Sequence, residues 1–185
     1  MVELPVILPP IDTARLHLRM LTPDDVTDIF DYASSPDVAK FMNWDAHTTI
    51  EDSQRFLDRI LQSDRINEPY VWGIELTALR KIIGTVGFHN WRRIRETTEI
   101  GYVIGKPHWN KGYMTEAVGG VLDYFFRDLK MHRVEAVCDI ANFASERVMQ
   151  KLGMKLEGVM RSSLLMKDTY NDGKLYAILR DEWVK

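Results

Sequence analysis

The sequence has little cysteine and no long apolar run. Cys138 is the one cysteine among 185 residues, so neither an internal disulfide nor a metal site built from several thiolates can form. No stretch approaches the roughly 20 apolar residues that a membrane-spanning helix needs. Residues 1–16 contain three prolines, lack a basic leader and hold an apolar stretch too short for the core of a secretion signal. These absences predict a soluble protein of the reducing cytoplasm with no membrane partner.

An excess of one charge is lacking as well. The chain has 24 Lys and Arg against 27 Asp and Glu, a formal charge of −3, which disfavours direct nucleic-acid binding but leaves room for a local basic patch. Its five histidines show no zinc-ligand spacing and no EF-hand signature is present, so no metal is expected. No internal repeat, low-complexity tract or linker divides the sequence. A single domain over residues 1–185 is therefore expected.

Helical periodicity recurs along the chain. Thr22 is a candidate N-cap, with Pro23 in the first turn behind it. The strongest pattern follows residue 114, where apolar residues keep the spacing i, i+3, i+4 and i+7. The predicted helices cover residues 22–33, 48–61, 114–129 and 142–153. The helix at 48–61 is expected to bury Ile50, Phe56, Leu57, Ile60 and Leu61.

Short β-branched and aromatic runs between polar turns predict the strands. They cover residues 14–21, 70–76, 81–91, 97–105 and 133–141, and two more strands complete the chain. The last hairpin turns either at residues 171–173 or at residues 167–169. The order of elements is strand, two helices, three strands, helix, strand, helix and two strands. This order predicts an α/β or α+β fold, with a seven-stranded sheet flanked by about four helices.

The stretch HWNKGYMTEA (residues 108–117) leads into the strongest predicted helix without a serine or aspartate N-cap. Helix N-termini carry unpaired N–H groups and partial positive charge, and Gly112 would permit a positive φ or close approach of a phosphate. A ligand phosphate is therefore expected to cap this helix. The alternative is that Gly112 only turns the chain, with Thr115 or water completing the cap. The P-loop and the fingerprint G-x-G-x-x-G are both absent, which disfavours a nucleotide-binding protein.

Two segments carry a resemblance to a known family: TTEIGYVIGKPHWNKGYMTEAVGGVLDYFF (residues 97–126) and NFASERVMQKLGMKLEG (residues 142–158). They resemble the GCN5-related N-acetyltransferases (GNAT), and most of all the RimJ/RimL branch of ribosomal-protein N-terminal acetyltransferases. The resemblance extends over residues 14–183. It implies a mixed, mostly antiparallel sheet that is splayed between its fourth and fifth strands and holds acetyl-CoA as co-substrate in the cleft. Exposed apolar edges would also allow a homodimer.

In this family a loop of pattern Q/R-x-x-G-x-G/A holds the pyrophosphate through backbone amides. Trp109 here replaces the Gln or Arg, as looks usual for the branch, and Met114 replaces the small last residue. Because backbone donors survive a change of side chain, binding is expected to persist with an altered pocket floor. The cofactor-binding residues implied by the resemblance are Tyr102, Val103, Ile104, Trp109, Asn110, Lys111, Gly112, Tyr113, Met114, Thr115, Asn142 and Ser145.

A thioester is already activated, so acetyl transfer requires a base for the ammonium, stabilisation of the oxyanion and departure of the sulfur. Glu99, in the family's E-I-G-Y segment, is the candidate general base through a water; the alternative is a salt-bridged strand residue. Ser145 is the candidate acid or thiolate stabiliser, because Met149 occupies the place where many relatives carry a tyrosine. Asn142 would contact the pantetheine arm, cap its helix, or do both. No covalent intermediate is needed, so Cys138 is expected to be an inert core residue.

The acceptor site is the least legible part of the sequence. Trp44 in NWDAH, and His89 and Trp91 in FHNW, supply aromatic and polar groups that could wall a pocket for the amine. The resemblance favours a protein N-terminal α-amino group as the acceptor. Acetylation of a small amine or an antibiotic is one alternative. A non-catalytic acyl-CoA sensor that keeps the loop but lacks the proton chemistry is another.

Overall fold

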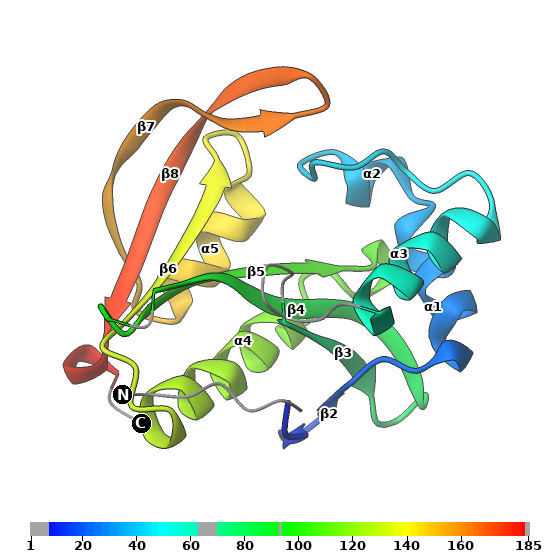
Figure 1. The fold of residues 1–185 in the computed structure, drawn as a ribbon, viewed down its shortest axis with the longest axis horizontal. Helices are drawn as coiled ribbons and strands as arrows, with labels where there is room; N and C mark the ends of the chain where they lie inside the picture. Colours follow the sequence, from blue (N-terminus) through cyan, green and yellow to red (C-terminus); the bar gives the residue numbers. More distant parts are fainter. Residues whose placement is uncertain (1–7, 63–69, 93, 184–185) are drawn as a thin grey trace.

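The computed structural model describes residues 8–62, 70–92 and 94–183. In that part of the chain, eight strands form one sheet in the order β1-β2-β3-β4-β5-β6-β8-β7 (Figure 1). The strands are β1 (Ile11–Asp12), β2 (Leu16–Arg19), β3 (Tyr70–Leu76), β4 (Lys81–Arg92), β5 (Thr97–Ile104), β6 (Arg133–Asp139), β7 (Lys155–Met166) and β8 (Thr169–Leu179). The α-helices are α1 (Val26–Ala33), α2 (Pro36–Ala39), α3 (Ile50–Gln62), α4 (Tyr113–Asp123) and α5 (Phe143–Lys151). A 3₁₀ turn (Pro23–Asp25) precedes α1, and a π-helical turn (Tyr124–Asp128) extends α4.

Residues 1–7, which belong to the segment where the sequence predicts no secretion signal, lie outside the described residues. Across the described ranges, no helix combines the length and the apolar character needed to cross a bilayer.

The sequence predicts most of these elements, with two differences and one alternative decided. The sheet gains an eighth strand because residues 11–12 pair antiparallel with residues 17–18. The four-residue helix α2 follows α1. The last hairpin turns at Lys167 and Asp168, both with positive φ, as a two-residue hairpin loop requires. This is the second of the two predicted positions, and residues 171–173 lie inside β8.

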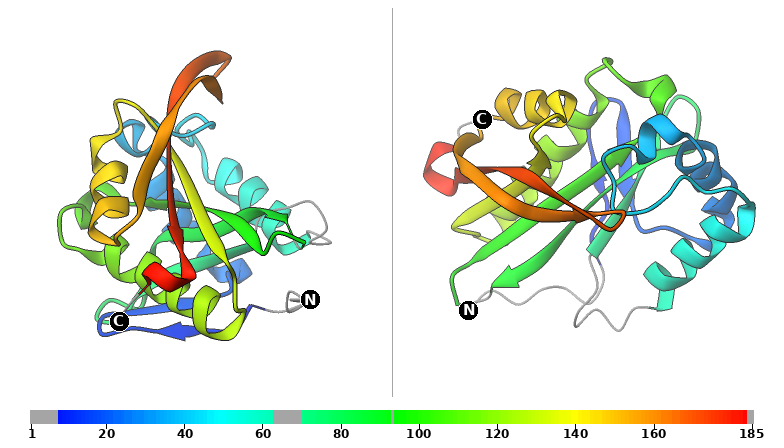
Figure 2. Two further views of the ribbon diagram at one scale, coloured as in Figure 1. Left: turned by 90° about the vertical axis from the view of Figure 1, so that its left-hand side faces the viewer. Right: turned by 90° about the horizontal axis from the view of Figure 1, so that it is seen from above.

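Helices cover both faces of the sheet (Figure 2). A large core cluster packs α4 and part of α5 against one face, and a smaller cluster packs α1 and α3 against the other. On β4, Ile82 belongs to the smaller cluster and Ile83 to the larger one, as the alternation of side chains along a strand requires. A Cβ on Gly120 of α4 would lie 3.2 Å from methyl groups of Ile11 and Thr13. This glycine therefore lets α4 approach the β1 edge of the sheet closely.

The predicted buried stripe of α3 is wrong at its two ends. Leu57 is fully buried, but Ile50 is 38% and Leu61 39% exposed. Phe56 and Ile60 are partly buried and pack against the smaller core cluster beside Leu57. One turn before Leu57 the buried position belongs to Ser53, whose Oγ lies 2.8 Å from His47 Nδ1. Ser53 is thus a buried polar residue with a hydrogen-bond partner, and the apolar pattern of the helix does not predict its burial.

The sheet divides between β5 and β6, which run parallel. They pair only over residues 97–99 and 133–135, although β5 continues to Ile104 and β6 to Asp139. Beyond that point β6 keeps its antiparallel pairing with β8, so β5 and β6 diverge (Figure 1). They are the fourth and fifth strands of the predicted order. The predicted splay of the sheet is therefore confirmed.

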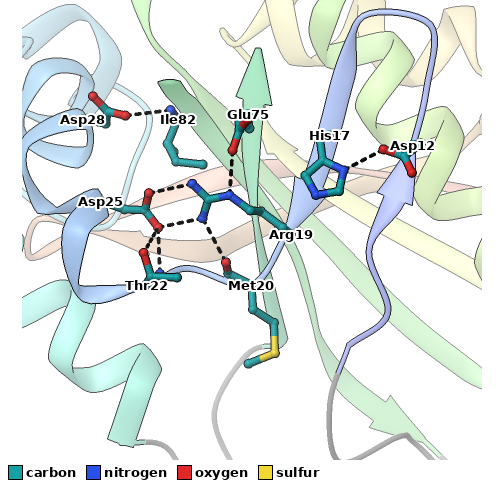
Figure 3. Close-up of polar contacts among 9 residues, drawn as sticks. All are labelled: Asp12, His17, Arg19, Met20, Thr22, Asp25, Asp28, Glu75 and Ile82. Carbon is teal, nitrogen blue, oxygen red and sulfur yellow. Dashed lines mark hydrogen bonds and ion pairs between the residues drawn. The ribbon is translucent and has the colours of Figure 1, made fainter. Parts of the chain in front are cut away.

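A buried ion network fixes the start of α1 to the sheet (Figure 3). The Asp25 carboxylate accepts hydrogen bonds from Arg19 Nη1 and Nη2, both at 2.8 Å, and from the Thr22 backbone N–H at 2.7 Å. Arg19 Nε donates to Glu75 Oε2 of β3 at 2.7 Å. Burial raises the pKa of Asp25, but its hydrogen bonds to Arg19 and Thr22 bring that pKa below the ordinary value. The network joins β2, β3 and the turn that opens α1.

Asp25→Asn is expected to lower the free energy of unfolding by about 2–4 kcal/mol, because Arg19 loses a buried partner charge. Asp24→Asn is the matched control, since Asp24 is exposed in the same turn and its change should stay within about 0.5 kcal/mol. Urea unfolding at pH 7 measures both variants. Equal losses in the two would contradict the anchoring role of Asp25.

Wild type and D25N together also test the pH dependence of the stability that Asp25 contributes. Because the pKa of Asp25 is lowered in the folded state, its contribution is present above the unfolded pKa and disappears as pH falls through the folded one. The difference in stability between wild type and D25N should therefore shrink as the pH drops below about 4.

Candidate active site

Helix α4 begins behind Gly112, which adopts φ 80° and ψ −2° and receives no capping hydrogen bond from any described side chain. Asn110, two residues earlier, also has a positive φ of 59°. The first-turn N–H groups of α4 therefore remain those of an uncapped helix terminus, with its partial positive charge. Thr115 does not close the terminus. The geometry is the one that the predicted phosphate site needs.

Arg15, which the sequence does not single out, braces this turn. Its Nε donates to Glu116 Oε2 at 2.7 Å, and its Nη1 donates to the carbonyl of Lys111 at 3.0 Å. At the other end of the loop, Trp109 Nε1 donates to the carbonyl of Ile104 at 2.8 Å. The loop from 109 to 112 is thus held in shape from both sides by protein contacts.

Met114, the departure from the family pattern, has a structural explanation. Its side chain is buried in the large core cluster together with Ala117 and Val118 of the same helix. The methionine therefore fills the interface between α4 and the sheet. Asn110 and Lys111, by contrast, are exposed on the loop.

Tyr102 and Ser145 meet across the diverging strands. Tyr102 Oη, from β5, lies 2.9 Å from Ser145 Oγ in the first turn of α5. Burial raises the pKa of Tyr102, so its hydroxyl stays protonated at neutral pH. Asn142 is the N-cap of α5, where its Oδ1 accepts from the Ser145 backbone N–H at 3.1 Å. Two residues that the sequence places in the site separately are therefore direct neighbours.

Glu99 lies at the last paired position of β5 and β6. Its Oε2 accepts a hydrogen bond from Asn90 Nδ2 at 3.0 Å, and its Oε1 lies 3.4 Å from His89 Nε2. Burial raises the pKa of Glu99, but the contacts with His89 and Asn90 and the charge of Arg92 bring it below the ordinary value. The side chain remains 22% exposed. Glu99 is thus a carboxylate at neutral pH that water can still reach.

A pocket of about 260 Å³ lies between α1, α3 and strands β3 to β5. Trp44 and His89, two of the residues expected at the acceptor site, line it. Gly101 and Val103, which share a face of β5 with Glu99, line it as well. The pocket therefore lies next to the Glu99 carboxylate, and His89 belongs to both.

Trp91, the third residue expected at the acceptor site, does not line this pocket. Its ring centre lies 6.0 Å from that of Phe88, and it packs against the large core cluster on the other face of the sheet. The regular alternation of β4 ends there, because the register with β5 shifts between His89 and Arg92 and Asn90 has a φ of 53°. This irregularity separates Trp91 from the other acceptor residues.

Cys138 is buried, and burial raises the pKa of its thiol to about 11. A protonated, buried thiol is a poor nucleophile, which agrees with the expected inert role. Among the described residues, no group of three or more His, Cys, Asp or Glu side chains is arranged to hold a metal ion.

Comparisons with known proteins identify the family. Residues 15–155 match the Acetyltransferase (GNAT) domain. The chain is 31% identical over 172 residues to the uncharacterized N-acetyltransferase YoaA of Bacillus subtilis (strain 168). The aligned region covers 93% of this chain and 97% of that protein. The crystal structure of a GNAT-family acetyltransferase from Bacillus anthracis is similar with a TM-score of 0.84 and 30% identity, over 94% of this chain and 100% of that one. The ribosomal-protein-serine acetyltransferase of Escherichia coli (strain K12) is 27% identical over 101 residues, 55% of this chain and 56% of that protein.

The chain therefore belongs to the GNAT acetyltransferases, as the two sequence motifs predict. It is an N-acetyltransferase, and its acetyl donor is acetyl-CoA. The uncapped start of α4 fits the pyrophosphate of that donor, because no side chain of the described residues caps the first-turn N–H groups behind Gly112.

Several contacts of the site leave no trace in a single sequence. The pairing of Arg15 with Glu116 joins residues 101 positions apart, and Arg15 belongs to no recognisable motif. The shift of register after His89 cannot be predicted from the sequence either, because FHNW is typical of an ordinary strand end. The motif residues were found by their spacing, whereas the residues that position them follow from the topology.

Gly112→Ala should weaken acetyl-CoA binding about 10-fold, because a left-handed conformation costs a non-glycine residue about 1–2 kcal/mol and a loop that relaxes from it no longer directs its N–H groups at the phosphate. The added Cβ would also lie 3.4 Å from Arg15 Nη2. Gly153→Ala is the matched control, since Gly153 has a φ of 79° but lies at the far end of α5. Thermal unfolding should show similar losses of stability for both variants, and calorimetric titration should show a loss of affinity for G112A alone. Wild-type affinity in G112A would contradict the proposed role of this loop.

Proposed function

We propose that this N-acetyltransferase acts on the α-amino group of a protein N-terminus, with Glu99 as general base and Ser145 as proton donor to the leaving sulfur. The position of Glu99 carries the proposal. Its carboxylate lies where β5 and β6 separate and contacts His89, which lines the pocket next to it. The similarity to a ribosomal-protein-serine acetyltransferase supports a protein as the acceptor.

Glu99 has the ionic form that a base requires. A free α-amino group has a pKa of about 8, so much of the acceptor arrives as an ammonium ion at neutral pH. The Glu99 carboxylate takes one proton from it through a water molecule. Asn90 and His89 hold the carboxylate in place. The freed lone pair of the nitrogen can then attack the acetyl carbonyl, which acetyl-CoA supplies in activated form.

Ser145 and Tyr102 supply the second proton. Ser145 Oγ donates to the sulfur as the carbon–sulfur bond breaks, and the Tyr102 hydroxyl, 2.9 Å away, returns a proton to Ser145. Because the pKa of Tyr102 is raised by burial, its proton is present throughout the neutral range. Tyr102 recovers it from solvent. The nitrogen loses two protons in all: the first passes through water and Glu99 to solvent, and the second goes through the same water to Glu99 as the nitrogen attacks. The sulfur gains one proton from Ser145, so an ammonium and acetyl-CoA give an amide, the CoA thiol and one released proton.

Acetylation of a small primary amine is the second candidate. The observation that favours it is the pocket of about 260 Å³, which has room for a small molecule as a whole. The comparison that separates the two candidates uses a peptide and the free amino acid amide with the same first side chain. A kcat/KM at least 10-fold higher for the peptide supports the protein acceptor, and the reverse order supports the small amine.

Glu99→Gln should lower kcat about 100-fold or more, because general-base catalysis contributes factors of this size. The affinity for acetyl-CoA should stay within about 2-fold, since Glu99 does not belong to the phosphate loop. Glu135→Gln is the matched control: Glu135 stands beside Glu99 in the register of β6 but is paired with Arg133 at 2.8 Å. Thiol release and calorimetry measure the two quantities. Full activity in E99Q would refute the assignment of the base, and binding without turnover in wild type would favour the sensor.

The pH profile gives an independent test of the base. Because the pKa of Glu99 lies below the usual carboxyl range, Glu99 is already ionised where the acceptor is still protonated. The value of kcat/KM should therefore rise with pH along the pKa of the acceptor amine, near ~8 for an α-amino group. A second acceptor with a lower amine pKa should shift the profile by the same amount. A profile that stays fixed would assign the titration to a group of the enzyme.

A further inference from the structure

The pocket next to Glu99 is walled by uncharged side chains. Of the described residues that line it, none is Asp, Glu, Lys or Arg. Apolar side chains come from several of the surrounding elements, among them Ile29 from α1, Ile60 from α3 and Val71 from β3. Trp44 adds an indole from the segment between α2 and α3. Such a wall favours an apolar occupant over a charged one.

The ionisable side chains that line the pocket are those of Tyr32, His47, His89 and Tyr102, and burial raises the pKa of both tyrosines. His47 Nδ1 lies 2.8 Å from Ser53 Oγ, and burial lowers its pKa, so the ring is neutral at pH 7. His89 is directed to the Glu99 carboxylate at 3.4 Å. A charged group placed in the pocket would lose water without meeting an opposite charge on its walls. Burial of a charge under those conditions is strongly unfavourable.

The pocket is continuous with the place where the amine must react. His89 lines it and contacts Glu99, and Gly101 lines it one step further along the same face of β5. A Cβ on Gly101 would find its nearest atom, His89 Cε1, only at 4.0 Å, so this wall leaves room. A short side chain attached to an amine beside Glu99 can therefore reach into the pocket.

We propose, on the basis of the function proposed above, that this pocket binds the side chain of the acceptor's first residue. The acetyltransferase then prefers N-termini that begin with an apolar residue such as leucine, methionine or phenylalanine to those that begin with arginine or aspartate. Burial of such a side chain corresponds to a preference of about 10- to 100-fold in kcat/KM.

The test measures kcat/KM of the wild-type enzyme for peptides that differ only in their first residue: Leu, Met, Phe, Ser, Arg or Asp. Phenethylamine and putrescine serve as small apolar and small charged acceptors. A preference of at least 10-fold for Leu, Met or Phe over Arg and Asp supports the inference. Acetylation of all peptides within about 3-fold overturns it, while the N-terminal acetyltransferase function stands.

The small amines separate the two proposals. Turnover of phenethylamine well above putrescine, with no peptide acetylated, leaves the apolar pocket standing and refutes the protein acceptor. Turnover confined to putrescine or to the arginine peptide overturns the pocket inference. No turnover with any acceptor, in an enzyme that binds acetyl-CoA, overturns both.

A pair of neighbouring residues on α3 tests the pocket wall itself. Ile60 lines the pocket, whereas Leu61 is 39% exposed and lies outside it. Ile60→Asp should lower kcat/KM for the leucine peptide at least 10-fold and raise the activity with the arginine peptide relative to it, because the wall gains a negative charge. Leu61→Asp should leave both values unchanged within about 2-fold. An unchanged order of preference in I60D would show that the side chain binds elsewhere.

Discussion

Three residue pairs join β5 to β6, and this short pairing determines where the residues of the candidate site lie. Two parallel strands can pair as far as both extend, yet this pair ends at Glu99, whereas β6 stays paired with β8 as far as Asp139. Past that point the Tyr102–Ser145 hydrogen bond connects the two halves in place of a backbone ladder. The end of the pairing therefore does two things. It exposes the Glu99 carboxylate where the strands separate. It also means that side chains, and not backbone hydrogen bonds, bridge the space between the strands.

Sequence reasoning reached the elements whose signal is local. The periodic helix after residue 114 and the strands on both sides of the divergence are written in neighbouring residues, and the motif around Gly112 is recognisable by spacing. Contacts set by topology were out of reach: Arg15 on Glu116, the edge strand at residues 11–12, and the position of Trp91. The ends of α3 failed for a related reason, since amphipathic spacing says which face is apolar but not how far the partner surface extends.

Two carboxylates show how the same forces give different outcomes. Burial raises the pKa of both Asp25 and Glu99, and hydrogen bonds reverse the shift in each case. Asp25 meets the full charge of Arg19 and is closed off from solvent, so it acts as a fixed anchor. Glu99 has an amide and an imidazole as partners and stays within reach of water. Partner strength and access, rather than the sign of the shift, distinguish a structural acid from a candidate base.

The contact between Arg15 and the α4 turn also bears on the folding stability of the enzyme. Since the brace joins Arg15, just before β2, to a turn 101 positions later in the sequence, it forms only when these distant segments have come together. If this loop binds acetyl-CoA as proposed, the donor meets a backbone that needs little further ordering, and it has no matching site on the unfolded chain. By mass action, donor at 100 times its Kd would add about 2.7 kcal/mol to the stability of the fold. The acetyl donor would thereby stabilise the folded state as well as supply the acetyl group.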